Sequence, residues 1–196
     1  MTHTDLHEFL RSRRSIRRFR EDPIPDPVLE RILTTATYAP SAHNRQPWRF
    51  AVVTTPAAKG CLAGAMAADF RRDLSAAGVA HDEITSQIER SERRITSAPV
   101  VIVLCLDADS VDHYPEPARS EAERMMAVQS VAAAATQMLL AAHAEGLGAN
   151  WICWPLFASE TVRDALDLPG SWEPQAMIFL GWPGAEPKPK DVRPLG

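Results

Sequence analysis

The strongest constraint on the fold is an apolar run at residues 100–106, VVIVLCL, which directly follows Pro99. The run is short and rich in β-branched side chains, and it lacks the alternating polar positions of a half-exposed strand. Such a run is typical of a central strand that is buried on both faces. We therefore expect a sheet that is flanked by helices.

Further stretches along the chain predict the elements around that strand. Strands are expected at residues 49–54, 149–154 and 175–182. Helices are expected over 5–12, from 26 to before Pro40, over 57–97 with a break near Gly78, over about 118–144 and over 159 to about 166. Asp26 and Ser159 are expected to cap two of these helices. The pattern predicts one α+β domain over residues 1–196, with a mixed or antiparallel sheet and an extended Pro-rich tail from about 183.

Composition narrows the functional classes. The chain has 196 residues, 45% of them hydrophobic, and a net charge of −4. This charge argues against general binding to nucleic acid or to anionic membranes, and no apolar run approaches the roughly 20 residues of a membrane span. The N-terminus does not resemble a secretory signal. The widely spaced Cys61, Cys105 and Cys153 indicate reduced thiols in a cytoplasmic protein.

The densest chemical signal is RSRRSIRRFR at residues 11–20, in which six of ten residues are Arg. If this segment is extended, Arg13, Ser15 and Arg17 lie on the same face. Two guanidinium groups around a hydroxyl suit a phosphate dianion, because Arg offers forked, charge-assisted donors. A solvated basic turn, or an arm that touches nucleic acid, would have the same composition.

Two loops add polar groups. YAPSAHNRQPW at residues 38–48 joins a helix to a strand, and Pro47 favours an extended Gln46. EGLGANW at residues 145–151 places glycines where the long helix ends and a strand begins. Taken alone, the first could be an ordinary connection with Trp48 as a core anchor, and the second a helix C-cap.

Together these segments resemble the nitroreductase family, and the resemblance extends from Leu6 to Leu195. RRSIRRF is similar to the family's N-terminal flavin-binding segment, and residues 40–48 contain every fixed letter of its Pro-Ser-x-x-Asn-x-Gln-Pro-Trp loop. EGLGANW is similar to its Gly-Leu-Gly turn, and VRPL at residues 192–195 to its closing Arg-Pro-Leu phosphate contact. The resemblance implies that the protein binds FMN and takes electrons from NADH or NADPH. It also implies a homodimer with the long helix and both flavins at its interface.

The resemblance also implies a role for each matching residue. Arg13, Ser15 and Arg193 would bind the phosphate, with Lys190 as a further candidate, and Arg14 would lie near the ring or the phosphate. Arg17 would approach the N1/O2 edge of the ring, where a fixed cation stabilises the negative charge of reduced flavin.

The polar loop would contribute further contacts. Ser41, Asn44 and Gln46 would contact the ring and the ribityl chain, and Pro40 and Ser41 would serve the flavin of the partner subunit.

One segment departs from the family pattern. Many relatives have Glu-Gly where this chain has Cys153 and Trp154. A backbone N–H near flavin N5 survives this change, but an acidic side chain does not. We expect Cys153 to be buried and to pack as a small hydrophobic residue. We expect Trp154 to narrow the pocket or to stack on the substrate.

The sequence thus predicts an FMN-dependent oxidoreductase with ping-pong turnover, in which the flavin carries the chemistry and no side chain acts as nucleophile or metal ligand. Residues 156–174 further resemble the flavin domain fused to the glutamyl ligase of deazaflavin-coenzyme biosynthesis. The acceptor would then be a dehydro precursor of that coenzyme, or else a nitroaromatic or a quinone. The alternatives are a flavin-binding storage or sensor protein without turnover, and a nucleic-acid-binding arm.

Overall fold

The computed structural model describes residues 3–187 and 189–194, and its centre is the strand β2 (Val100–Asp107), in which every residue is buried. This strand pairs antiparallel with β1 (Trp48–Val53) and β4 (Trp172–Gly181). The shorter β3 (Gly148–Ile152) pairs antiparallel with β4, so the strand order is β1-β2-β4-β3. The expected α+β class, central buried strand and antiparallel sheet are confirmed.

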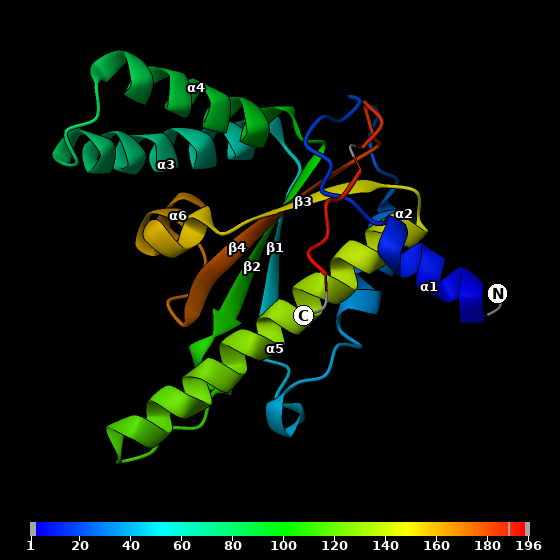
Figure 1. Ribbon diagram of the computed structural model, residues 1–196. Helices are drawn as coiled ribbons and strands as arrows, with labels where there is room; N and C mark the ends of the chain where they lie inside the picture. Colours follow the sequence, from blue (N-terminus) through cyan, green and yellow to red (C-terminus); the bar gives the residue numbers. More distant parts are fainter. Residues whose placement is uncertain (1–2, 188, 195–196) are drawn as a thin grey trace.

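The two faces of the sheet are covered by different helices. On one face lie α5 (Pro117–Ala144), which crosses the sheet diagonally, and α2 (Asp26–Ala36) (Figure 1). On the other lie α3 (Pro56–Ala76) and α6 (Ser159–Ala165). Alternate side chains of β2 serve the two faces, as the period of two requires: Ile102, Leu104 and Leu106 join the first core, and Val101, Val103 and Cys105 the second.

Next to the second core, α3 and α4 (His81–Ser97) form a helical hairpin, seen at the upper left of Figure 1. The turn between them contains Gly78 at φ +74°, a conformation that glycine adopts without strain. Their own small apolar cluster contains Ala67, Ile84 and Ile88. The predicted break near Gly78 is confirmed.

The N-terminal segment is attached to the sheet by its backbone. After α1 (His3–Ser12), residues 13–20 run extended, and Ile16 N–H donates to the Ala149 carbonyl at 2.9 Å. Arg20 N–H donates to the Trp182 carbonyl, and Gly184 N–H donates to the Arg18 carbonyl, each at 2.9 Å. We call residues 13–20 the strap.

Glycines allow this close approach. A Cβ atom on Gly148 would lie 2.7 Å from the Ile16 side chain, and one on Gly181 would lie 2.8 Å from Phe19 Cβ. Gly146, by contrast, has open space around it and ends α5 with φ +75°. The predicted glycine-rich join therefore combines a helix end at Gly146 with a contact surface for the strap at Gly148.

Several expected boundaries are wrong. Asp26 and Ser159 are not caps: each is the first residue of its helix, and neither preceding residue, Pro25 or Ala158, makes a side-chain capping bond. The strand β3 ends at Ile152 and does not extend to residue 154, because a 3-10 turn over Trp154–Phe157 begins two residues later.

The structure also describes most of the C-terminal tail and all three cysteines. The described tail residues beyond Pro183 have no regular structure, and Leu195 lies outside the described residues. The three cysteines are unpaired, and burial raises the pKa of the Cys105 thiol to about 12.

Within the described part of the chain, α5 is the one helix long and apolar enough to cross a membrane, with a mean hydropathy of 1.4. Half of that apolar window is buried, and the helix packs on α2, β2 and β3. Long core helices of globular domains meet the same criterion.

We expect Gly148→Ala to destabilise the protein by about 1–3 kcal/mol, because the added methyl group overlaps Ile16 and displaces the strap. Chemical denaturation would measure the loss. Gly60→Ala is the matched control: Gly60 is exposed in α3 with nothing near its added Cβ, so alanine should be neutral or stabilising. Equal stability of the two variants would contradict the contact.

Candidate functional site

The strap lines a cavity of about 720 Å³. Its walls come from the strap and from the tail: Arg13, Arg14, Ser15, Ile16, Arg17, Arg18, Ala185, Glu186, Pro187, Pro189 and Lys190. Five of the predicted binding residues, Arg13, Arg14, Ser15, Arg17 and Lys190, are thus brought together. Arg193 is exposed on the tail and is not part of this lining.

The donors in this cavity are not equivalent. The Arg14 guanidinium donates to the carbonyls of Arg11 at 2.5 Å and Arg13 at 2.9 Å, so it supports the local backbone. In the part of the chain that the structure describes, the side chains of Arg13, Ser15 and Arg17 have no hydrogen-bond or ion-pair partner. These three groups, predicted to share one face, are free to bind an anion.

His143 lies at the base of the strap, in the last turn of α5. Its ring stacks on Phe9 with centroids 4.8 Å apart, and its Nε2 lies 2.8 Å from Ser12 Oγ. Burial lowers the pKa of His143, and the positive charges of Arg13 and Arg14 lower it further. The neutral ring therefore joins α1 to the core beside the basic cavity.

The polar loop at residues 40–47 is internally bonded. Ser41 Oγ accepts from Gln46 N–H at 3.1 Å, and Gln46 Nε2 donates to Asn44 Oδ1 at 3.1 Å. The Ala42 N–H donates to Ser130 Oγ of α5 at 3.2 Å. Three residues of this loop have left-handed backbone angles: His43 and Asn44 at φ 52° and Gln46 at φ 50°. Non-glycine residues adopt such angles at a cost, and they cluster at functional sites.

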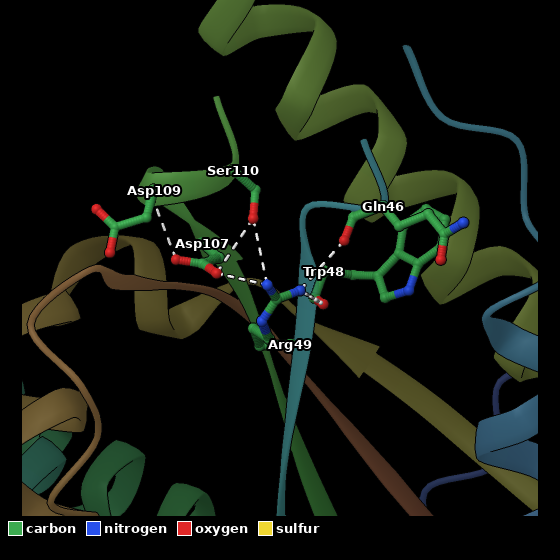
Figure 2. A network of polar contacts seen from close by, with 6 residues as sticks. All are labelled: Gln46, Trp48, Arg49, Asp107, Asp109 and Ser110. Carbon is green, nitrogen blue, oxygen red and sulfur yellow. Dashed lines mark hydrogen bonds and ion pairs between the residues drawn. The ribbon is translucent and has the colours of Figure 1, made fainter. Parts of the chain in front are cut away.

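Gln46 is not extended, contrary to the expectation from Pro47. The reason lies in a network at the end of this loop, which Figure 2 shows. The Arg49 guanidinium donates to the carbonyls of Gln46 at 3.2 Å and Trp48 at 2.9 Å. It also lies 2.6 Å from the buried carboxylate of Asp107 and donates to Ser110 Oγ at 3.2 Å. Arg49 thus ties the loop to the end of β2. Nothing in the sequence singled it out.

The polar loop does not reach the basic cavity within one chain. Figure 1 shows the loop, with its 3-10 turn Ala42–Asn44, below α5, whereas the strap lies at the opposite, upper side near β3. Pro40, Asn44 and Gln46 are exposed, and none of them lines the basic cavity. The two predicted halves of the binding site are therefore separate surfaces of this chain.

The turn after β3 forms a third region. Cys153 is exposed, so the expectation of a buried side chain is wrong; its Sγ accepts from the Trp151 indole N–H at 3.1 Å. Trp154 packs edge-on against Phe70 of α3, with ring centroids 5.0 Å apart. Both residues line a cavity of about 450 Å³ between α3 and this turn.

Comparison with known proteins decides the family. The model of the nitroreductase family matches residues 10–182 of this chain. The chain belongs to the nitroreductase family. The matched range contains the strap, the polar loop and the turn after β3.

Relatives within the nitroreductase family carry several names. The chain is 33% identical to a 5,6-dimethylbenzimidazole synthase of Rhodospirillum rubrum, over 94% of this chain and 84% of that protein. It is 36% identical to an NADH dehydrogenase of Thermus thermophilus, over 93% of this chain and 89% of that protein. A crystal structure of a putative nitroreductase from Desulfovibrio desulfuricans in complex with FMN is 28% identical and superimposes with a TM-score of 0.74, covering 99% and 94% of the two chains.

We expect Arg49→Met to cost about 1–3 kcal/mol of folding free energy, because Asp107 would stay buried without its partner. Amide hydrogen exchange at residues 41–47 should also accelerate. Arg45→Met is the control, since Arg45 pairs with Asp112 at an exposed site, where such pairs contribute about 0–1 kcal/mol. Equal losses would show that Arg49 does not hold the loop.

Stability should fall as pH falls below about 6.5, the ordinary pKa of histidine. The pKa of His143 is lowered in the folded protein, so protonation favours the unfolded state, and the contribution is lost as pH falls through the folded pKa. Denaturation midpoints between pH 5 and 8 would measure this. His143→Phe keeps a ring that can stack on Phe9 but cannot titrate, so its profile should be flatter. An unchanged profile would rule out His143 as the source.

Proposed function

We propose that the protein is an FMN-dependent oxidoreductase that passes electrons from NADH or NADPH to a small organic acceptor by a ping-pong mechanism. The observation that carries this proposal is the cavity in which Arg13, Ser15 and Arg17 present unpaired donors. The strap that forms one wall of this cavity lies within the region that matches the nitroreductase family, residues 10–182. The FMN complex of the relative from Desulfovibrio desulfuricans supports the choice of cofactor.

The residues of the cavity fit a flavin phosphate. Arg13 and Ser15 offer charge-assisted and hydroxyl donors that the protein itself does not use, and Lys190 adds a positive charge from the tail. Arg193 remains a proposed phosphate ligand. Arg14 would act indirectly, because its guanidinium holds the backbone of the strap at Arg11 and Arg13. Gly148 lets the strap lie close to β3, so these donors gather at the edge of the sheet.

Other residues would hold the ring. Arg17 would place a fixed positive charge near N1 and O2, where reduced flavin is negative. Cys153 and Trp154 begin a helical turn, and the first N–H groups of such a turn have no partner inside it; one of them would donate near N5. When bound, FMN supplies the exchange of two electrons between the nicotinamide and the acceptor.

The proposal includes a homodimer. The exposed Pro40, Asn44 and Gln46, together with the half-buried Ser41, would complete the flavin site of the partner subunit, because they do not line the cavity of their own chain. Tyr38, beside this loop, is 79% exposed, so its ring would be available to an interface formed there. We expect the dimer to act in the cytoplasm.

The decisive experiment is the visible spectrum of the purified protein, before and after anaerobic addition of NADH and then NADPH. An oxidised-flavin spectrum that bleaches is the expected result. A flavin spectrum that neither nicotinamide bleaches would favour a storage or sensor protein, and absence of flavin after incubation with FMN would overturn the proposal. Accumulation of 5,6-dimethylbenzimidazole would instead assign the activity named for the relative from Rhodospirillum rubrum.

We expect Arg13→Ala to weaken FMN binding by about 10- to 100-fold, the usual effect of losing a charge-assisted hydrogen bond. Fluorescence titration of apoprotein with FMN would measure the affinity. Arg20→Ala is the matched control, because Arg20 pairs with Asp22 at 3.2 Å outside the cavity. Unchanged affinity in Arg13→Ala would remove Arg13 from the phosphate site.

We expect Arg17→Ala to make the flavin harder to reduce, because a positive charge near N1 favours the reduced form. The midpoint potential, measured with a reference dye, should become more negative than that of the wild type and of Arg20→Ala. An unaltered potential would show that Arg17 is a surface charge.

A further inference from the structure

Three cavities meet around Phe70, on the side of the sheet that holds the α3–α4 hairpin. The largest, about 450 Å³, is lined by Asp69, Phe70, Asp73, Cys153, Trp154, Phe157 and Ala158. A second, about 180 Å³, is lined by Phe70, Ser91, Arg94, Ile95, Ile152, Trp154 and Phe179. A third, about 300 Å³, is lined by Phe70, Glu83, Gln87, Arg90, Ser91 and Arg94. Phe70 lines all three, and we call these neighbouring cavities together the hairpin recess.

The walls of the recess suit a flat ring. Phe70 and Trp154 meet edge-on at 73°, and Phe157 is 78% exposed at the rim. Aromatic faces and edges bind a further planar ring by offset or edge-to-face contact. Cys153 and Trp154 also begin the turn proposed to run past the flavin, so a ring bound here would lie next to the cofactor.

Two of the three carboxylates of the recess, those of Asp69 and Asp73, are already compensated by a cation. Asp69 accepts a hydrogen bond from the Thr161 hydroxyl and lies 2.6 Å from the Arg72 guanidinium. The bond from Thr161, and after it the contact with Arg72, lower the pKa of Asp69. Asp73 lies 3.5 Å from the same guanidinium. This side of the recess therefore offers little attraction to a cation.

The opposite side offers a free positive charge. Arg94 lines both smaller cavities, with Ser91 beside it. Its side chain has no hydrogen-bond or ion-pair partner among residues 3–187 and 189–194, whereas Arg90 donates to Ser86 Oγ at 3.4 Å and Glu83 accepts from Gln87. A guanidinium at the edge of an apolar recess binds a carboxylate in preference to a neutral group.

We propose that the hairpin recess binds an aromatic acceptor that carries an anionic group, with the ring against Phe70 and Trp154 and the anion on Arg94 and Ser91. The inference rests on the proposed function, because it takes the ligand of the recess to be the electron acceptor. Arg94 is then a specificity-determining residue, which selects the substrate and takes no part in the electron transfer.

The test compares matched anionic and neutral probes. Binding of benzoate and benzamide to the FMN-loaded protein would be measured by calorimetry. Reoxidation of dithionite-reduced protein by 4-nitrobenzoate and 4-nitrobenzamide would be followed by stopped flow. We expect benzoate to bind more tightly than benzamide, and Arg94→Gln to weaken benzoate binding about tenfold with benzamide changed by less than about twofold. Arg94→Lys should retain part of the preference.

Arg93→Gln is the control, because Arg93 is an exposed neighbour that lines none of the three cavities. Equal binding of the two probes to the wild type, or equal weakening of both by Arg94→Gln, would overturn the inference. The inference would also be overturned if Arg94→Gln changed the preference for NADPH over NADH and left benzoate binding unaffected. Calorimetry and dithionite reduction need no nicotinamide, so a failure of the proposed donor reaction would be seen separately, in the bleaching experiment.

Discussion

The backbone attachment of the strap to the sheet is the constraint on which the binding face depends. Six arginines lie within residues 11–20, and their mutual repulsion opposes any ordered arrangement. Order comes instead from three backbone hydrogen bonds and from Ile16 and Phe19, whose side chains occupy the space that glycine leaves at positions 148 and 181. Without this attachment the same residues would form a solvated basic arm, one of the alternatives that the sequence left open.

The chain presents the two groups of predicted binding residues on separate surfaces. The strap and the tail enclose a basic cavity, while the loop at residues 40–47 presents its polar groups beneath α5 (Figure 1). The network around Arg49 and Asp107 holds that loop in strained backbone angles (Figure 2). A rigid loop costs little further conformational entropy when it meets a ligand, and this rigidity suits the role that we propose for the loop in the flavin site of a partner subunit.

The fold was largely predictable, because β2 is an unbroken run of apolar, mostly β-branched residues and α5 is a long apolar segment that ends at a glycine. The strap could also be located from its sequence, and Arg13, Ser15 and Arg17 do line one cavity, although Arg14 and Arg18 between and beside them line it as well. The errors arose where distant residues decide local geometry. The backbone of Gln46 follows from Arg49 and Ser41 rather than from Pro47, and Cys153 is exposed because a 3-10 turn follows β3 at once. Phe70 and Arg94 gave no signal, because on a helix their pattern is that of any amphipathic surface.

The strap is fixed by main-chain bonds, while its outward side chains make few contacts with the rest of the protein. If the strap binds the cofactor as we propose, changes at those positions alter ligand chemistry with little effect on folding, whereas changes at the glycines beneath affect folding first. Affinity and redox behaviour can vary by substitution at one set of positions, and stability is maintained at another. This separation gives a family with one scaffold a simple route to diverge in activity, because new chemistry need not first be offset by stabilising mutations elsewhere.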